Sequence, residues 1–318
     1  MRSIREFCNA DLPGLTRVWS EHWESVGMPP AVSAAIIDRA ILSRTFFHPH
    51  DLIVAEDNGH LQAWAYLSRP SISEDPRLQD NDDHLAVVSA ICFTQEGLRF
   101  SDQILAAAEQ RARDLGCTRL QVGLARDQMC GFAGLPPVGH GIGVPEDDMR
   151  VASLLSRQGY SPENQYLRMA VTTAPYRPPT NRTMIQFRRT TRAERSAVVP
   201  QSGRYASAMS HLDIEHYQLI NHRTGEHLAN ARLWLSDPEA QVMSCSEAIL
   251  DLTVTETPGE LTDAERFLVS ALVQSLATRC VFKVETAIDA SHRTLETQLT
   301  ELVFSAAGRG QRWVKPLT

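Results

Sequence analysis

Residues 87–116 constrain the fold of this chain more than any other stretch. They read VVSAICFTQEGLRFSDQILAAAEQRARDLG, an apolar run, a short turn around Gly97 and an amphipathic run. Apolar runs bounded by turns are typical of buried strands, and i, i+3, i+4 spacing is typical of helices. The pattern therefore predicts a strand, a turn and a helix. The first N–H groups of a helix have no partner within it, so this turn is a natural place for an anion such as a phosphate.

The same order of elements occurs twice along the chain. Residues 248–279 echo 87–116, and each half also contains a predicted hairpin with a glycine at its turn, Gly59 in one and Gly225 in the other. The remaining matched segments are a strand followed by a helix (4–19 and 185–198), a strand (120–124 and 281–288) and a helix that ends in an aromatic residue (147–160 and 292–304). The repeat indicates two related halves.

A segment rich in proline and threonine separates the halves. Residues 172–183 read TTAPYRPPTNRT and show no apolar periodicity, which is typical of a linker. The sequence thus predicts a domain at 1–171, a linker at 172–183 and a domain at 184–318. A length of 318 residues agrees with two domains, at about 100–200 residues each.

Composition excludes several classes of protein. The net charge is −7 and no basic patch is visible, so we expect no nucleic-acid partner. No signal peptide and no membrane-length apolar run is visible, so we expect a soluble, cytoplasmic protein that binds no membrane. The six cysteines form no CxxC pair, which favours reduced thiols. Cys130 and His140 could share a metal but lack further ligands, and we expect no metal site. A homodimer stays open.

Several segments resemble the GNAT superfamily of acyl-CoA N-acyltransferases. Residues 96–101 (EGLRFS) stand where that family has its pyrophosphate loop. Residues 154–160 (LLSRQGY) resemble its late helix with a Gly-aromatic end, and residues 166–169 (YLRM) resemble its closing strand. The resemblance implies an α+β, three-layer fold with two GNAT-like domains. Each would be a mixed, mostly antiparallel sheet flanked by helices.

The resemblance also implies a co-substrate and its site. Acyl-CoA, most simply acetyl-CoA, would donate its acyl group to the amine of a small molecule or peptide by direct attack. The implied cofactor-binding residues are Ile91, Cys92, Phe93, Gly97, Leu98, Arg99, Phe100, Ser101 and Asp102. Ser101 or Asp102 is the expected N-cap of the helix. Arg99 would reach a phosphate of CoA, or else lie solvated on the surface.

The two halves depart from the family pattern to different degrees. Glu96, Arg99 and Ser101 replace the preferred residues of the loop, and the late-helix tyrosine position falls at Leu155. In the second half, residues 262–265 (TDAE) predict a capping box, which would occupy the donors of the helix start. We therefore expect the first half to bind acyl-CoA. The second would be structural or would shape the acceptor pocket, and its helix around 267–273 is apolar nearly all round, as at a domain interface.

Three residues are candidates for acid–base catalysis. They are His84, with Asp83 beside it, His140 in the loop 130–148, and Tyr160. That loop is rich in glycine and proline and is expected to shape a binding cleft. Asp251 is expected to be either a remnant of a catalytic position or a structural residue. An alternative function stays open, in which the chain is a catalytically inactive GNAT-fold module that binds acyl-CoA or a protein partner.

Overall fold

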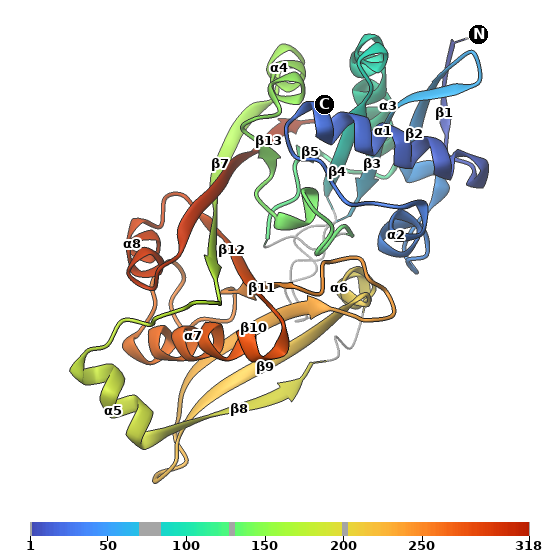
Figure 1. Cartoon of the computed structure of the whole chain (residues 1–318). Coiled ribbons are helices and arrows are strands. Elements are labelled where there is room, and N and C mark those ends of the chain that lie inside the picture. Colours follow the sequence, from blue (N-terminus) through green and yellow to red (C-terminus); the bar gives the residue numbers. More distant parts are fainter. Residues whose placement is uncertain (1, 70–83, 127–130, 199–202, 318) are drawn as a thin grey trace. The chain divides into compact units, whose positions relative to one another are not determined.

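The protein is described from a computed structural model that covers residues 2–69, 84–126, 131–198 and 203–317 (Figure 1). The chain divides into two compact units. Unit 1 comprises Met1–Gln165, Pro200–His211 and Arg309–Thr318, and unit 2 comprises Tyr166–Val199 and Leu212–Gly308. Among the helices of these described ranges, none is long and apolar enough to cross a membrane.

Unit 1 is built on a mixed sheet with the strand order β1-β2-β3-β4-β5-β13. The pair β4–β5 is parallel, whereas β1–β2, β2–β3, β3–β4 and β5–β13 are antiparallel. Its strands are β1 (Arg2–Glu6), β2 (Leu52–Asp57), β3 (His60–Ser68), β4 (Leu85–Phe93), β5 (Arg119–Val122), β6 (Val144–Pro145) and the end of β13 (Ser305–Pro316). Its helices are α1 (Leu12–Ser25), α2 (Ala34–Ile37), α3 (Ser101–Asp114), α4 (Met149–Arg157) and α6 (Gly203–Met209).

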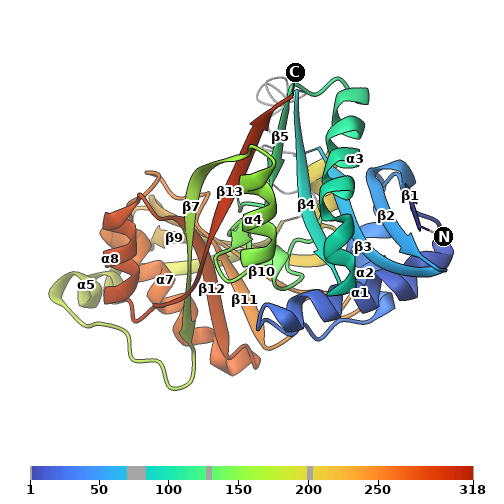
Figure 2. The same ribbon diagram turned by 90° about the horizontal axis from the view of Figure 1, so that it is seen from above.

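Helices cover both faces of this sheet. Successive residues of a strand point to opposite faces, and β3 shows the consequence. Ala63 and Ala65 lie in the core cluster that also contains Ile104 and Leu105 of α3. Trp64 points the other way, and its indole N–H donates to the carbonyl of Leu15 in α1 at 3.2 Å. Unit 1 therefore has three layers, with α3 and α4 on one face and α1 on the other (Figure 2).

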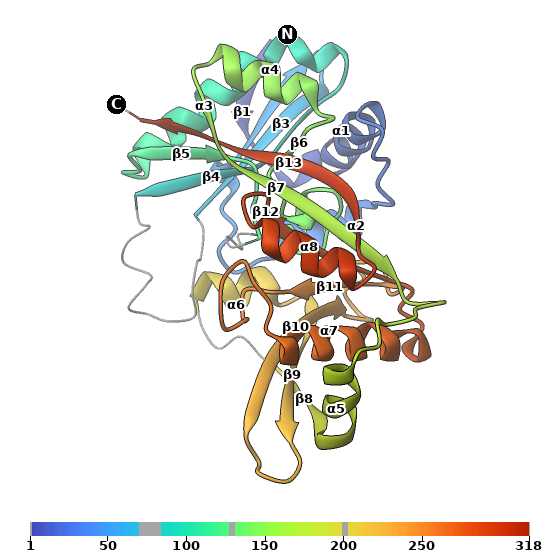
Figure 3. The same cartoon turned by 90° about the vertical axis from the view of Figure 1, so that its left-hand side faces the viewer.

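Unit 2 repeats this type of sheet with the order β7-β12-β11-β10-β9-β8. Here β11–β12 is the parallel pair, and its neighbours β10–β11 and β12–β7 are antiparallel. The strands are β7 (Ser161–Thr172, its second half), β8 (Thr191–Ala197), β9 (Leu212–Asn221), β10 (His227–Ser236), β11 (Glu247–Asp251) and β12 (Lys283–Asp289). The helices are α5 (Arg182–Thr190), α7 (Asp263–Leu276) and α8 (Arg293–Glu301), seen together in Figure 3.

Helix α7 is buried on more than one side, as its sequence predicts. Leu268, Val269 and Leu272 lie in the core cluster of unit 2. Another side of the helix is covered by α5, where the rings of Phe187 and Phe267 are 5.6 Å apart. A helix of the same unit therefore supplies the cover that the sequence analysis had assigned to a domain interface.

Each unit takes one strand from the other half of the sequence. Residues 166–172 of β7 pair with β12 in unit 2, although the sequence predicts them as the closing strand of the first domain. Residues 313–316 of β13 pair with β5 in unit 1. The compact units thus differ from the predicted ranges 1–171 and 184–318. Residue periodicity marks a segment as a strand but does not say which sheet it joins.

Most predicted elements are present, with two local corrections. The predicted hairpins form around Gly59 and Gly225, and the overall fold is the predicted α+β type. The stretch 185–198 was predicted as a strand followed by a helix, but helix α5 precedes strand β8 there. The predicted linker is anchored rather than loose. The Tyr176 hydroxyl, for example, donates to the carbonyl of Leu302 at 3.2 Å.

Candidate functional site

The sheet of unit 1 opens between its two parallel strands. Pairing of β4 with β5 runs from Leu85 opposite Arg119 to Val88 opposite Val122, while β4 itself continues to Phe93. The register of β4 with β3 slips by one residue at this point, so that Ser89 forms a bulge. A bulge bends a strand and increases its twist. Beyond Val88, β4 therefore turns away from β5 at the carboxyl ends of both strands, a common place for ligands in such sheets.

A segment of the glycine- and proline-rich loop occupies this opening. The cavity left there has a volume of about 20 Å³, and Val138, Gly143, Val144 and Pro145 help to line it. Such a volume is close to the minimum that holds one water molecule. The loop was expected to shape a cleft, but in this state it fills the opening.

Glycine allows this segment to pack closely. Gly143 has a φ of +77°, and a Cβ atom there would lie 2.4 Å from the carbonyl oxygen of Gln311 in β13. On the other side, the Gly143 N–H donates to the carbonyl of Leu124 at 2.8 Å. Val144 then pairs with Gln311. The segment is held between the end of β5 and β13 by main-chain contacts.

A buried histidine holds the end of β4. His22 of α1 is fully buried, and its Nε2 lies 2.9 Å from a carboxylate oxygen of Asp148, the N-cap of α4. Its Nδ1 accepts from the main-chain N–H of Phe93 at 3.3 Å and lies 3.1 Å from a guanidinium nitrogen of Arg150. Because Nδ1 faces two donors, we place the ring proton on Nε2, where it is donated to Asp148. Arg150 also lies over the ring of Phe93, at 5.5 Å from its centroid.

The turn after β4 already uses donors that the sequence analysis assigned to phosphate. It is a 3-10 helix, Glu96–Phe100, that runs directly into α3. The Gly97 N–H donates to the carbonyl and hydroxyl of Thr94, at 3.1 Å and 3.0 Å. A Cβ atom on Gly97 would lie 2.0 Å from the carbonyl oxygen of Gln62. Glycine is therefore required here for the turn to pack against β3.

The predicted N-cap of α3 is wrong. The N-cap residue is Phe100, which makes no side-chain cap, and Ser101 and Asp102 are already within the helix. Asp102 instead accepts from Arg157 at 2.7 Å and from Gln158 at 2.9 Å. The hydrogen bond from Arg157 keeps the pKa of Asp102 below its ordinary value. Ser101 cannot be the N-cap because the preceding 3-10 turn already includes it in helical structure. Its N–H donates to the carbonyl of Leu98.

The other predicted cofactor residues line up along the end of β4 and its turn. Ile91, Cys92 and Phe93 are buried in β4, and burial raises the pKa of the Cys92 thiol. Leu98 and Phe100 pack into the core of unit 1. Arg99 is partly exposed, and its guanidinium pairs with Asp57 at the end of β2.

The structure does not bring the acid–base candidates together. His84 is exposed at the start of β4, roughly 30 Å along the strand from Phe93 at about 3.3 Å per residue. Tyr160 is buried, and its hydroxyl donates to Glu109 at 3.1 Å; burial and the Glu109 charge raise the pKa of Tyr160 well above its usual range. His140 is buried in the 3-10 turn Val138–His140, whose first residue lines the small cavity, but His140 itself does not line it. Asp83 and Cys130 lie outside the described residues.

The corresponding turn of unit 2 is closed by its own side chains. The predicted capping box is confirmed, with the Glu265 N–H donating to the Thr262 hydroxyl at 3.2 Å and the Thr262 N–H donating to the Glu265 carboxylate at 2.8 Å. The same carboxylate accepts from the Glu256 N–H at 2.8 Å. Asp251 is buried and accepts from the N–H and hydroxyl of Thr253, which agrees with a structural role.

His22, Asp148 and Arg150 were not predicted from the sequence. One signal was present, since His22 continues the apolar stripe Leu15, Val18, Trp19 at helical spacing. A polar residue on such a stripe indicates a buried partner, but spacing alone does not identify that partner. In the described parts of the chain, no group of three or more His, Cys, Asp or Glu residues is placed to hold a metal ion.

Comparison with solved structures identifies proteins of similar fold. No protein-family model matches the sequence, and no curated protein matches it. A GCN5-related N-acetyltransferase from Sphaerobacter thermophilus superposes with a TM-score of 0.64 at 13% identity, over 99% of this chain and 96% of that one. A tandem GNAT protein from the clavulanic acid biosynthesis pathway, solved without AcCoA, gives a TM-score of 0.65 at 13% identity, over 100% and 99% of the chains.

A third similar structure is part of a longer protein. It is the glucosamine N-acetyltransferase region of a fungal multi-domain β-N-acetylglucosaminidase, with a TM-score of 0.69 at 11% identity. The match covers 99% of this chain and 38% of that one. Together the three structures show that this chain has the tandem GNAT fold.

Proposed function

We propose that this chain, which has the tandem GNAT fold, is an acyl-CoA-dependent N-acyltransferase. Its acyl-CoA would enter unit 1 between β4 and β5. The observation that carries the proposal is that parallel pairing stops at Val88 while β4, bent by the bulge at Ser89, continues to Phe93. An extended ligand with amide groups can pair with such a strand edge. The self-capped turn of unit 2 favours unit 1 as the acyl-CoA site.

Entry of acyl-CoA requires the segment 138–145 to move. The cavity of about 20 Å³ that remains beside it is far smaller than a pantetheine arm needs. The contacts to be broken include the Gly143 N–H to Leu124 hydrogen bond and the pairing of Val144 with Gln311. The phosphates would then lie near the turn 94–100, where Arg99 could exchange Asp57 for a phosphate.

The reaction would be direct transfer. The amine nitrogen attacks the thioester carbonyl carbon, the C–S bond breaks, and the thiolate of CoA leaves with the electron pair. The amine loses one proton to a base, and the thiolate takes up one proton from an acid. Of the predicted acid–base residues, His140 remains the candidate, because it belongs to the segment beside the opening. Acetyl-CoA as donor and a small-molecule or peptide amine as acceptor stay part of the proposal.

A second candidate function, a module without turnover, is supported by a separate observation. The cavity of about 20 Å³, together with the internal use of the Phe93 and Gly97 N–H groups, favours a module without turnover. Such a module would use the same fold to bind acyl-CoA or a protein partner.

Binding of acetyl-CoA to the full chain tests both proposals. At a hundredfold excess over Kd, a ligand stabilises the folded state by about 2.7 kcal/mol, which a thermal-shift assay detects. We expect that shift, together with changed hydrogen exchange at Ala90–Phe93 and at 138–145. No shift with any acyl-CoA would exclude both acyl-CoA readings. Thiol release in the presence of an amine panel would favour the enzyme, and a shift without thiol release would favour the module.

The role of His140 has a separate test. In the enzyme, His140→Gln is expected to lower kcat for thiol release while leaving the affinity for acetyl-CoA unchanged. His227→Gln is the matched control, because His227 is an exposed residue of unit 2. Equal activity of the two variants would remove His140 from the mechanism without removing the proposed acyl-CoA site.

A further inference from the structure

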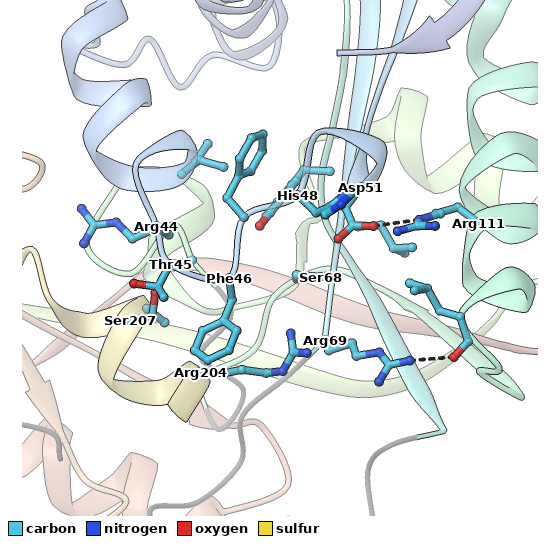
Figure 4. A pocket seen from close by; sticks show the side chains of 17 residues that line it. Arg44, Thr45, Phe46, His48, Asp51, Ser68, Arg69, Arg111, Arg204 and Ser207 are labelled. Carbon is cyan, nitrogen blue, oxygen red and sulfur yellow. Dashed lines mark hydrogen bonds and ion pairs between the residues drawn. The ribbon is translucent and has the colours of Figure 1, made fainter. Parts of the chain in front are cut away.

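Unit 1 contains a second, larger cavity of about 440 Å³ (Figure 4). It lies between the loop 41–51 after α2, the end of β3, the end of α3 and helix α6, and no residue of β4 lines it. Its volume is within the range of small-molecule sites, about 300–1,000 Å³. The cavity is therefore separate from the opening proposed for acyl-CoA.

Positive charge dominates the wall of this cavity. Four arginines line it, and Asp51 is the one carboxylate among the described residues that line it. Asp51 accepts from Arg111 at 2.8 Å, so this pair is neutral. Arg69 donates to the main-chain carbonyl of Leu115 at 2.6 Å, which orients its guanidinium.

Arg44 has only neutral hydrogen-bond acceptors among the described residues. Its guanidinium donates to the Arg39 carbonyl and the Ser210 hydroxyl, which are neutral acceptors. Its Nε is buried without a hydrogen-bond partner in the described residues. Burial lowers the pKa of Arg44, only partly opposed by the charge of Asp38.

The rest of the wall is aromatic. Phe46 is 45% exposed although it is a large apolar side chain, and the guanidinium of Arg204 lies 5.1 Å from its ring centroid. The rings of Phe47 and Tyr66 are stacked with centroids 6.1 Å apart. Flat apolar surfaces beside guanidinium groups suit a ligand with an aromatic or alkyl body and an anionic end.

We propose that this cavity binds a small organic carboxylate, with its carboxylate on Arg204 and its apolar body against Phe46 and Tyr66. A planar carboxylate matches the fork of donors on a guanidinium group. Three segments of unit 1, the loop 41–51, β3 and α6, would contact the ligand at once, which suits a site that recognises a whole small molecule.

Calorimetry on the full chain tests the chemistry of the ligand. The probes are benzoate, phenylacetate, 3-phenylpropionate and octanoate, each compared with its neutral amide, and inorganic phosphate. We expect at least one carboxylate to bind about tenfold or more tighter than its amide and tighter than phosphate. The proposal is overturned if none of the four carboxylates binds, if the amides bind equally well, or if phosphate binds as tightly as the best carboxylate.

Two arginine substitutions locate the site. Arg204→Ala is expected to weaken binding of the best carboxylate about tenfold or more, because it removes a charged donor and the contact with Phe46. Arg119→Ala is the matched control, because Arg119 is a partly exposed arginine of β5 that does not line the cavity. Arg204→Lys keeps the charge and is expected to bind with intermediate affinity. Equal weakening by the Arg204→Ala and Arg119→Ala variants would mean that net charge alone attracts the probe, and would overturn the assignment.

Discussion

Two buried carboxylates of this protein take their partners from residues that lie far away in the sequence. Asp148 meets His22 across 126 residues, and Glu215 meets Arg279 across 64. Each is a buried carboxylate whose solvation by water has been replaced by hydrogen bonds. Removing one partner leaves the other group unsatisfied, so these pairs are sensitive points for stability.

Replacing Asp148 by Ala is expected to destabilise the protein by about 2–4 kcal/mol. The change removes the cap on the Val151 N–H of α4 and leaves the Nε2–H of His22 without an acceptor. Asp147→Ala is the matched control, because the neighbouring Asp147 is exposed. Urea unfolding of both variants measures the difference. Similar losses in the two variants would contradict the assigned role of the pair.

The ion pair of Glu215 predicts a dependence of stability on pH. Burial would raise the pKa of Glu215, but hydrogen bonds from Arg279 and Tyr217 outweigh it, and the pKa is lowered. A carboxyl group with a lowered folded-state pKa contributes stability above its unfolded pKa, near 4.3, and loses it as the pH falls through the folded value. Glu215→Gln is therefore expected to destabilise the protein at pH 7.

Measuring the native chain and the Glu215→Gln variant at low pH tests the direction of this pH dependence. The gap in unfolding free energy between the native chain and the Glu215→Gln variant should shrink as the pH falls below about 4.3. Glu226→Gln, at an exposed position beside the β9–β10 turn, should show little effect at either pH. A gap that stays constant with pH would show that packing, rather than the charge of Glu215, carries the effect.

At the scale of elements, the two strand–turn–helix segments differ in how far the local sequence determines the N-terminal cap of the helix. The cap of α7 was predictable because Thr262 and Glu265 satisfy each other within one turn of helix. The start of α3 was not predictable in this way, because the turn before it packs against β3. A Cβ atom on Gly97 would collide there with the main chain of Gln62. Contact with a neighbouring strand changed the cap from the one that local chemistry favours.

The loop segment in the β4–β5 opening gives a prediction about packing. Gly143→Ala is expected to destabilise the protein more than Gly159→Ala. The two glycines have φ angles of +77° and +80°, where Ala is strained by about 1–2 kcal/mol. Only at Gly143 would the new Cβ meet the main chain of Gln311, whereas Gly159 has open space. Thermal unfolding of the two variants measures the difference.

The same variant reports on the proposed acyl-CoA site. If the segment 138–145 must leave the opening before acyl-CoA binds, a change that weakens its packing raises the fraction of open protein. Gly143→Ala should then bind acetyl-CoA more tightly than the native chain, although it is less stable. Unchanged affinity, with Gly159→Ala as the reference, would mean that the segment does not gate this site.

At the scale of the whole molecule, unit 1 depends on the last residues of the chain. Residues 313–316 of β13 pair with β5, and the Lys315 ammonium donates to Glu109 of α3 at 2.7 Å. Leu317 is buried in the same core cluster. Without them, the edge of β5 and part of this core would be exposed to water.

A chain cut after residue 171 is therefore expected not to fold stably, although the sequence predicts its end as a domain boundary. Circular dichroism and thermal unfolding would show a loss of cooperative unfolding relative to the full chain. Joining 305–318 to the cut chain through a flexible linker should restore part of the stability, since it returns the strand that pairs with β5. Cooperative unfolding of the cut chain alone, at the temperature of the full chain, would contradict this expectation.

The sequence by itself determined the fold class, the two related halves, both hairpins and the cap of α7, because these depend on periodicity and on contacts within a few residues. Tertiary structure alone decided which sheet receives β7 and β13, which residues meet His22, and what fills the opening beyond Val88. These features depend on contacts between segments that are distant in the sequence. A pattern of residue types identifies a strand or a buried side chain, but the partner is selected only when the whole chain packs.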